Sequence, residues 1–191
     1  MTRLDHFDAS AFAVGRAVQA ASASLVRELL TLRDDEFVDW PSRAAYSNGW
    51  QTYLLRMPKP PGDLVLDHER IRRRLPVTTA LIDSLPTVQL CGVSRLLPGC
   101  HIFPHRDDPE PGVLRLHLGV RIEPRSGMRS EARTVQWATG AAFVFDHSQM
   151  HEAANEGTSP RDVLLLDFRP TAAELAWVQD QRAAWARRGS P

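Results

Sequence analysis

The sequence has little cysteine, a single lysine and no surplus of charge of either sign. Lysine and arginine together number 23, equal to the 23 acidic residues, and Lys59 is the only lysine. A general nucleic-acid-binding protein carries a basic surplus, so this balance disfavours that class. Cys91 and Cys100 match neither a zinc spacing nor a disulfide framework, and we expect two buried free thiols in a reducing compartment.

Long hydrophobic runs are also absent. No segment approaches the roughly 20 apolar residues that a membrane-spanning helix needs. The N-terminus does not resemble a signal peptide, because Asp5 and Asp8 stand where positive charge is expected and Arg16 interrupts the apolar stretch. We therefore expect a cytoplasmic protein with neither a membrane nor a nucleic-acid partner. The sequence does not predict its oligomeric state.

The first 86 residues are of mixed character. Apolar residues recur at helical spacing over 9–33, which predicts a helix. Residues 49–57 are typical of a strand, and the sequence PKPPGD at 58–63 predicts a turn or loop. A second helix is expected over 67–85, perturbed near Pro76.

After Pro86 the pattern changes to short segments rich in Val, Leu and Phe, bounded by Gly, Pro or Asp. Their spacing is typical of an antiparallel sandwich or barrel. A final helix is expected over 172–187, because Thr171 and Glu174 have the spacing of a capping box. The expected strands are 87–97, 113–122, 133–137, 141–146 and 161–169.

The segment HIFPHRDDPEPGVLRLHLG, 101–119, contains a candidate metal site. In an extended backbone, His105 and Asp107 project to the same side and offer an imidazole and a carboxylate to one point. A third ligand would come from His147 or His151 in FDHSQMHEAAN. Two histidines and one carboxylate on one face of a metal is the arrangement of non-haem Fe(II) oxygenases. A zinc site on one helical face is disfavoured, because Pro104 opposes a helix here.

Two arginines require an anionic partner. Arg115 and His117 alternate with leucines, so they face a barrel interior if the leucines pack against helices. A buried arginine needs an anion, and Arg161 at the start of an apolar strand raises the same need. Arginines near a candidate metal therefore predict an anionic co-substrate.

An ordered series of motifs resembles the aspartyl/asparaginyl β-hydroxylase family of Fe(II)- and 2-oxoglutarate-dependent oxygenases. The resemblance covers about residues 87–170, and its pieces are Ser94, PGCHIFPHRD, RLHLGV, Trp137-x-x-Gly140, FDHSQMHEAAN, Arg161 and DFRP. It implies a mainly β fold with flanking helices, the cupin-like double-stranded β-helix or jelly roll. It implies iron ligation by His105 and His151. Some relatives keep a carboxylate at the position of Asp107, and the resemblance to them implies Asp107 as a third ligand. It also implies 2-oxoglutarate binding by Ser94, Arg115, His117 and Arg161.

The resemblance further implies a dioxygenase that uses Fe(II), 2-oxoglutarate and O2 to hydroxylate an amino acid or amino-acid residue, free, carrier-bound or peptidyl. Desaturation, epimerisation or cyclisation at the same iron stays an alternative, as does a cupin-like binding protein without catalysis. We expect one domain over 1–191. It would consist of a supporting region at 1–86, a catalytic jelly roll at 87–170 and a C-terminal helix at 171–191.

Overall fold

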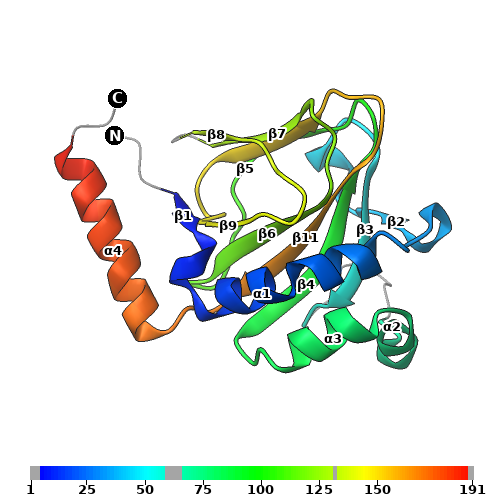
Figure 1. The fold of residues 1–191 in the computed structure, drawn as a ribbon. Coiled ribbons are helices and arrows are strands. Elements are labelled where there is room, and N and C mark those ends of the chain that lie inside the picture. The colour runs from blue at the N-terminus through cyan, green and yellow to red at the C-terminus, as the bar shows by residue number, and fades with distance from the viewer. Residues whose placement is uncertain (1–4, 59–65, 131–132, 189–191) are drawn as a thin grey trace.

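The computed structural model describes residues 5–58, 66–130 and 133–188. Within these ranges the strands form a seven-stranded and a four-stranded sheet, which are stacked as two layers in Figure 1. The larger sheet has the order β1-β9-β6-β11-β4-β3-β2 and the smaller sheet the order β5-β10-β7-β8. In chain order the strands are β1 (His6–Asp8), β2 (Val38–Asp39), β3 (Trp50–Arg56), β4 (Val88–Leu96), β5 (His101–His105), β6 (Leu114–Arg121), β7 (Ser126–Ser130), β8 (Thr134–Val135), β9 (Ala142–Phe145), β10 (His151–Asn155) and β11 (Arg161–Phe168).

The strands from β4 onward alternate between the two sheets, except that β7 and β8 are consecutive neighbours in the smaller sheet. The chain passes from β4 in the larger sheet to β5 in the smaller one and returns with β6; after β7 and β8 it alternates again through β9, β10 and β11. The resulting orders, β9-β6-β11-β4 and β5-β10-β7-β8, define a double-stranded β-helix. The predicted jelly roll with flanking helices is therefore confirmed, and β1, β2 and β3 extend its larger sheet.

Helices cover the outer face of the larger sheet (Figure 1). The predicted helix over 67–85 is divided in two, because Pro76 lacks an amide hydrogen and stands at the first position of a new helix. Glu28 caps that helix by accepting hydrogen bonds from the amides of Val77 and Thr78, each 2.7 Å long. The helices are α1 (Ala13–Leu29), α2 (His68–Arg74), α3 (Pro76–Asp83) and α4 (Ala172–Arg187), with short 3-10 helices at η1 (Ala9–Ala11), η2 (Asp34–Glu36) and η3 (Arg43–Ala45).

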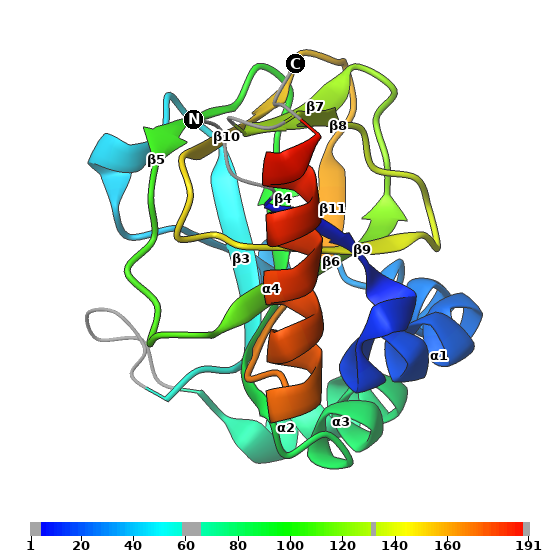
Figure 2. The ribbon, with the colours of Figure 1, turned by 90° about the vertical axis from the view of Figure 1, so that its left-hand side faces the viewer.

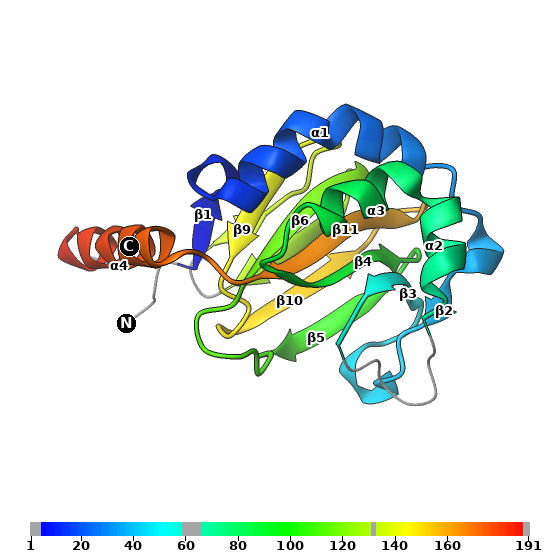
Figure 3. The same ribbon diagram turned by 90° about the horizontal axis from the view of Figure 1, so that it is seen from below.

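Helix α4 lies across one end of the two sheets (Figures 2 and 3). Its predicted capping box is confirmed: the Thr171 hydroxyl accepts from the Glu174 amide, and the Glu174 carboxylate accepts from the Thr171 amide. Of its residues, Val178 is fully buried. Within the described residues, no helix has the length and apolar character needed to cross a membrane.

The alternation along β6 separates core from cavity. Leu114, Leu116 and Leu118 are buried in the apolar core between the larger sheet and the helices. Each fully buried leucine stabilises the fold by about 2 kcal/mol. Arg115 and His117 consequently point to the opposite face, between the two sheets, as the sequence predicts.

A buried ion pair stabilises the outer face of the larger sheet. The Arg95 guanidinium is 1% exposed and donates to both carboxylate oxygens of Asp162, at 2.8 and 2.9 Å. We expect Asp162→Ala to lower the free energy of unfolding by about 3 kcal/mol, because it leaves a buried guanidinium short of its main partner. Urea unfolding at neutral pH measures this loss.

The matched control is Asp35→Ala, which removes the exposed partner of Arg33. This variant should stay within about 1 kcal/mol of the parent protein, since exposed pairs contribute little. Equal losses of unfolding free energy in both variants would show that the buried Arg95–Asp162 pair contributes no more to stability than an exposed pair.

Several strands were not among those predicted, namely β1, β2, β5, β7 and β10. The five predicted strands and the predicted strand over 49–57 are present as β4, β6, β8, β9, β11 and β3, each within a few residues of the expected bounds. The loop predicted over 58–63 falls, apart from Pro58, outside the described residues.

Candidate metal centre

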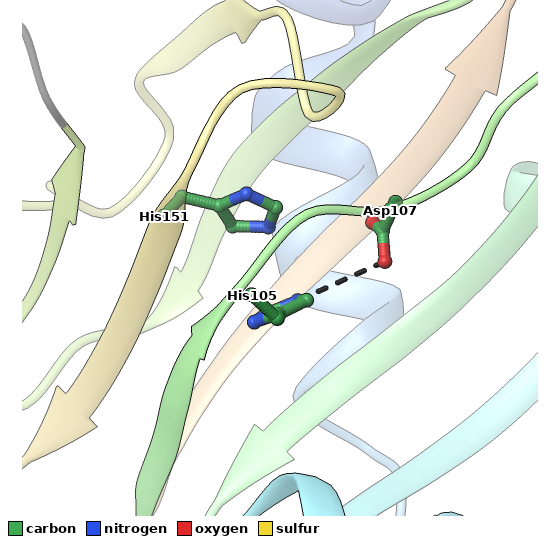
Figure 4. A group of neighbouring side chains, drawn as sticks. All are labelled: His105, Asp107 and His151. Carbon is green, nitrogen blue, oxygen red and sulfur yellow. Dashed lines mark ion pairs between the residues drawn. The ribbon is translucent and has the colours of Figure 1, made fainter.

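Three predicted ligands meet at one end of the smaller sheet. His105 ends β5, Asp107 follows two residues later, and His151 begins the neighbouring strand β10. His105 and His151 stand opposite each other in the β5–β10 register. One ligand atom from each residue lies within 4.8 Å of the other two, and Figure 4 shows the side chains facing a shared space. Residues from distant parts of the chain thus form a compact cluster.

Backbone carbonyls fix how the two imidazoles present their nitrogens. The Nδ1 atom of His105 lies 2.8 Å from the Phe103 carbonyl oxygen, and Nδ1 of His151 lies 2.9 Å from that of Gln149. A carbonyl only accepts, so each Nδ1 carries the hydrogen and each Nε2 keeps its lone pair free for a metal. Burial lowers the pKa of His151 to about 4, which leaves its imidazole neutral, the form that ligates metals.

Arg115 sets the orientation of Asp107. Its Nη1 donates to Oδ2 of Asp107 at 2.6 Å, while Oδ1 lies 3.7 Å from Nε2 of His105. Asp167 holds Arg115 in turn, accepting from Nε and Nη2 at 2.6 and 2.8 Å. Burial is the largest single influence and disfavours the charged carboxylate, but the Arg115 guanidinium and the neighbouring histidines together outweigh it and hold the pKa of Asp107 below its ordinary value. One carboxylate oxygen is thereby anchored and the other faces the histidines.

The contacts of Arg115 predict the effect of a conservative substitution. Arg115→Lys keeps the charge but loses the planar fork that bridges Asp107 and Asp167. We expect the affinity for Mn(II), titrated without any co-substrate, to fall by about 10- to 100-fold, as for other residues that orient metal ligands. Arg129→Lys is the control, because Arg129 pairs with Glu152 away from the cluster. Unchanged affinity in Arg115→Lys would mean that Asp107 is oriented without this arginine.

All seven residues predicted for the site line one cavity between the two sheets. They are Ser94, His105, Asp107, Arg115, His117, His151 and Arg161. The sequence therefore predicted which residues come together. It assigned Arg115 to the co-substrate, whereas the structure supplies two carboxylates of the chain itself as its partners.

Arg161 is a buried cation with no carboxylate partner among the residues that the structure describes. It is 1% exposed, its Nη1 donates to the Ser94 carbonyl at 3.1 Å, and its guanidinium lies 4.4 Å from the centre of the Trp137 ring. Its Nε has no hydrogen-bond partner, and no carboxylate of the described residues forms an ion pair with it. Burial lowers its pKa to about 10. A charged group so deeply buried requires an anion, and the cavity in front of it is open to one.

His117 supplies a neutral hydrogen-bond donor beside Arg161. The Trp137 indole donates to Nδ1 of His117 at 3.2 Å, so Nδ1 accepts and Nε2 carries the hydrogen. That Nε2 is buried and has no hydrogen-bond partner among the described residues. Burial holds the pKa of His117 well below its ordinary value, so the ring stays neutral. An acceptor on a bound ligand would satisfy this donor.

Trp50 also belongs to the site, although it was not among the predicted site residues. Its indole donates to the Ser94 hydroxyl at 3.2 Å and its ring stacks on Trp40. Tyr53, in contrast, packs on the helix side of the sheet with Phe37. The alternation along β3 was the available signal, because Trp50, Thr52 and Leu54 all line the cavity.

The residues fit a metal with an anionic co-substrate. Two imidazole nitrogens and one carboxylate oxygen converge on a shared space, and the same cavity ends at an unpaired buried guanidinium. The fold and this cluster together define a double-stranded β-helix protein of the two-histidine, one-carboxylate type.

Comparison with known proteins agrees with this class. The family model described as aspartyl/asparaginyl beta-hydroxylase matches residues 19–170, and the chain belongs to that family. It is 34% identical over 122 residues to the ornithine lipid ester-linked acyl 2-hydroxylase of Rhizobium tropici, covering 62% of this chain and 41% of that protein. It is 31% identical over 107 residues to the aspartyl/asparaginyl beta-hydroxylase of Homo sapiens, covering 52% and 14%. The chain thus spans less than half the length of either relative.

Solved structures are more distant in sequence. A prolyl hydroxylase from Trichoplax adhaerens, in complex with a peptide of the hypoxia inducible factor oxygen degradation domain, is 14% identical. The match covers 90% of this chain and 85% of that one, with a TM-score of 0.49. The fold given above follows from the strand order of this chain itself.

Proposed function

We propose that the protein is an Fe(II)- and 2-oxoglutarate-dependent dioxygenase that hydroxylates an amino acid or amino-acid residue, free, carrier-bound or peptidyl. Succinate and CO2 would be its co-products. The observation that carries the proposal is the presence, in one cavity, of the ligand cluster and of Arg161, which has no anionic partner within the described parts of the chain. A cupin-like binding protein has no use for that buried cation, so the enzymatic function is favoured.

Each site residue has a defined task under this proposal. His105, Asp107 and His151 would hold the iron, which together with 2-oxoglutarate supplies the activation of O2 for insertion of oxygen into a C–H bond. Arg161 would pair with the distal carboxylate of the co-substrate, and the Ser94 hydroxyl would add a hydrogen bond. His117 would donate from Nε2, and Arg115 keeps Asp107 in place.

The proposal also assigns roles to the segments of the chain and a cellular location to the protein. The seven site residues lie between Ser94 and Arg161, so we assign catalysis to residues 87–170 and support to 1–86 and 171–191 within one domain. The proposed substrate is a small amino-acid-like or peptidyl molecule. A cytoplasmic location without nucleic-acid or membrane partners is consistent with the net charge of zero.

Anaerobic titration tests the proposal directly. Adding Fe(II) and then 2-oxoglutarate to the purified protein should produce the visible absorption band of the chelated metal. Admitting O2 with a panel of free amino acids should then give succinate that rises for the true substrate. Binding without stimulated succinate would redirect the search to peptidyl or carrier-bound substrates. Failure to bind both iron and 2-oxoglutarate would reject the proposed enzyme.

A further inference from the structure

One wall of the cavity is entirely apolar. Leu165 on β11, Gly92 on β4 and Leu54 on β3 stand side by side across the larger sheet. Leu90, two residues before Gly92, continues the same face. This apolar wall, defined as Leu54, Leu90, Gly92 and Leu165, begins beside His117, which is paired with Leu165 across β6 and β11. It therefore starts where the proposed co-substrate site ends.

The wall presents hydrophobic surface to the cavity. Leu90 and Leu165 lie in β4 and β11, which have neighbours on both sides in the sheet, yet both remain half-buried. Leu54 covers the space above Gly92: a Cβ added to this glycine would meet Leu54 Cδ2 at 3.0 Å and the Tyr53 carbonyl oxygen at 3.1 Å. The glycine thus lets the Leu54 side chain lie flat along the wall.

The charged groups of the cavity already have partners or tasks. Arg115 is paired with Asp107 and Asp167. The other ionisable groups among the described lining residues are the metal cluster, His117 and Arg161, which the proposed function uses for the metal and the co-substrate. No ionisable side chain among the described residues of this lining is left to pair with a charged substrate group. Burying such a group against leucine would be strongly unfavourable.

We propose that the substrate group brought to the metal is an uncharged aliphatic chain, selected by Leu90 and Leu165. The inference rests on the proposed function. An aliphatic C–H bond would break and a C–O bond would form, with one atom of O2 entering the substrate and the other entering succinate as 2-oxoglutarate loses CO2. The chain belongs either to an aliphatic amino-acid residue or to an acyl group, and the experiment separates the two.

Three probes with uncharged amide head groups measure the preference for an aliphatic over a charged substrate group. They are N-acetyl-leucine amide, N-acetyl-aspartate amide and octanamide. Each is titrated calorimetrically into the protein loaded anaerobically with Fe(II) and 2-oxoglutarate. The leucine probe or octanamide should bind at least about 10-fold tighter than the aspartate probe, with a negative heat-capacity change. Tighter binding of the leucine probe identifies an amino-acid residue, whereas tighter binding of octanamide identifies an acyl chain and replaces the amino-acid substrate of the proposed function. Preference for the aspartate probe overturns the inference.

Variants of the wall test its role. Leu165→Asn and Leu90→Asn keep the branched shape of the side chain but replace its methyl groups by a polar amide, and each should weaken binding of the aliphatic probe about 10-fold. Val38→Asn is the matched control, because Val38 is 45% exposed on β2. The affinity of this variant for the aliphatic probe should not change. If an asparagine variant fails to fold, Leu165→Ala should still weaken binding, by about 5-fold. Unchanged affinity in the wall variants overturns the inference.

The two proposals fail in different ways. If iron and 2-oxoglutarate do not bind the parent protein, the proposed function falls and the inference falls with it. If both bind, and the aspartate probe alone stimulates succinate formation, the inference falls while the proposed function stands. Retained 2-oxoglutarate binding in the wall variants shows that they are folded, so their loss of probe affinity is specific.

Discussion

The Arg161→Leu variant is expected to lose at least about 100-fold in affinity for 2-oxoglutarate. Arg161 is the fully buried cation at the end of the cavity, and removing it takes away a charge-assisted pair with the co-substrate worth about 3 kcal/mol or more. The ligand-free variant should be as stable as the parent or more stable, because a buried charge without a partner is replaced by a hydrophobic side chain. Anaerobic absorbance titration gives the affinity, and thermal unfolding gives the stability.

The matched control is Arg121→Leu. Arg121 lies on β6, 3.7 Å from Asp162, and does not line the cavity. Its replacement should leave 2-oxoglutarate affinity unchanged. Added 2-oxoglutarate should raise the unfolding temperature of the control and fail to raise that of Arg161→Leu. If the co-substrate stabilises both variants equally, Arg161 is not its anchor.

His151→Ala is expected to abolish metal binding and, with it, all succinate formation. The substitution removes one of the three proposed ligands, and its imidazole is the one that the Gln149 carbonyl holds in position. The affinity for Mn(II) should fall more than about 100-fold, beyond the loss caused by residues that only orient ligands. Electron paramagnetic resonance of free Mn(II) measures the change. His105→Ala should behave in the same way.

His101→Ala provides the control for this loss. His101 is on the same strand as His105, but its Nε2 lies 2.7 Å from a carboxylate oxygen of Glu152 and outside the ligand cluster. This variant should bind Mn(II) as the parent does. An equal loss of metal affinity in His101→Ala would show that the cluster of three does not define the site.

The sequence predicted those parts of the fold whose patterns are local. Alternation over 113–122 and the capping box at Thr171 each gave an element at nearly its observed bounds. Strands β5 and β10 were not predicted, because HIFPH contains a proline and HEAAN lacks β-branched residues. These strands exist because each pairs with segments distant in the chain, which no local window contains.

In the candidate site, too, local spacing was predictable and contacts between distant segments were not. The spacing of His105 and Asp107 predicted two converging ligands, and they converge. The partners of Arg115 were not predictable, since Asp167 lies 52 residues away and reaches it only through the register of β6 with β11. The hydrogen bond from Trp50 to Ser94 likewise depends on the pairing of β3 with β4.

The position of the ligand cluster has a consequence for strand-edge protection. Strand β5 is an edge of the smaller sheet, and His105 at its end stands opposite His151. A metal held by both side chains, as the proposed function requires, would fasten this edge to its neighbour and fix their register, because a one-residue slip would turn His105 to the other face. Under the proposed function, loss of the metal would remove this fastening and leave the end of β5 more open to pairing with another chain. Iron depletion is then expected to promote aggregation as well as to abolish turnover.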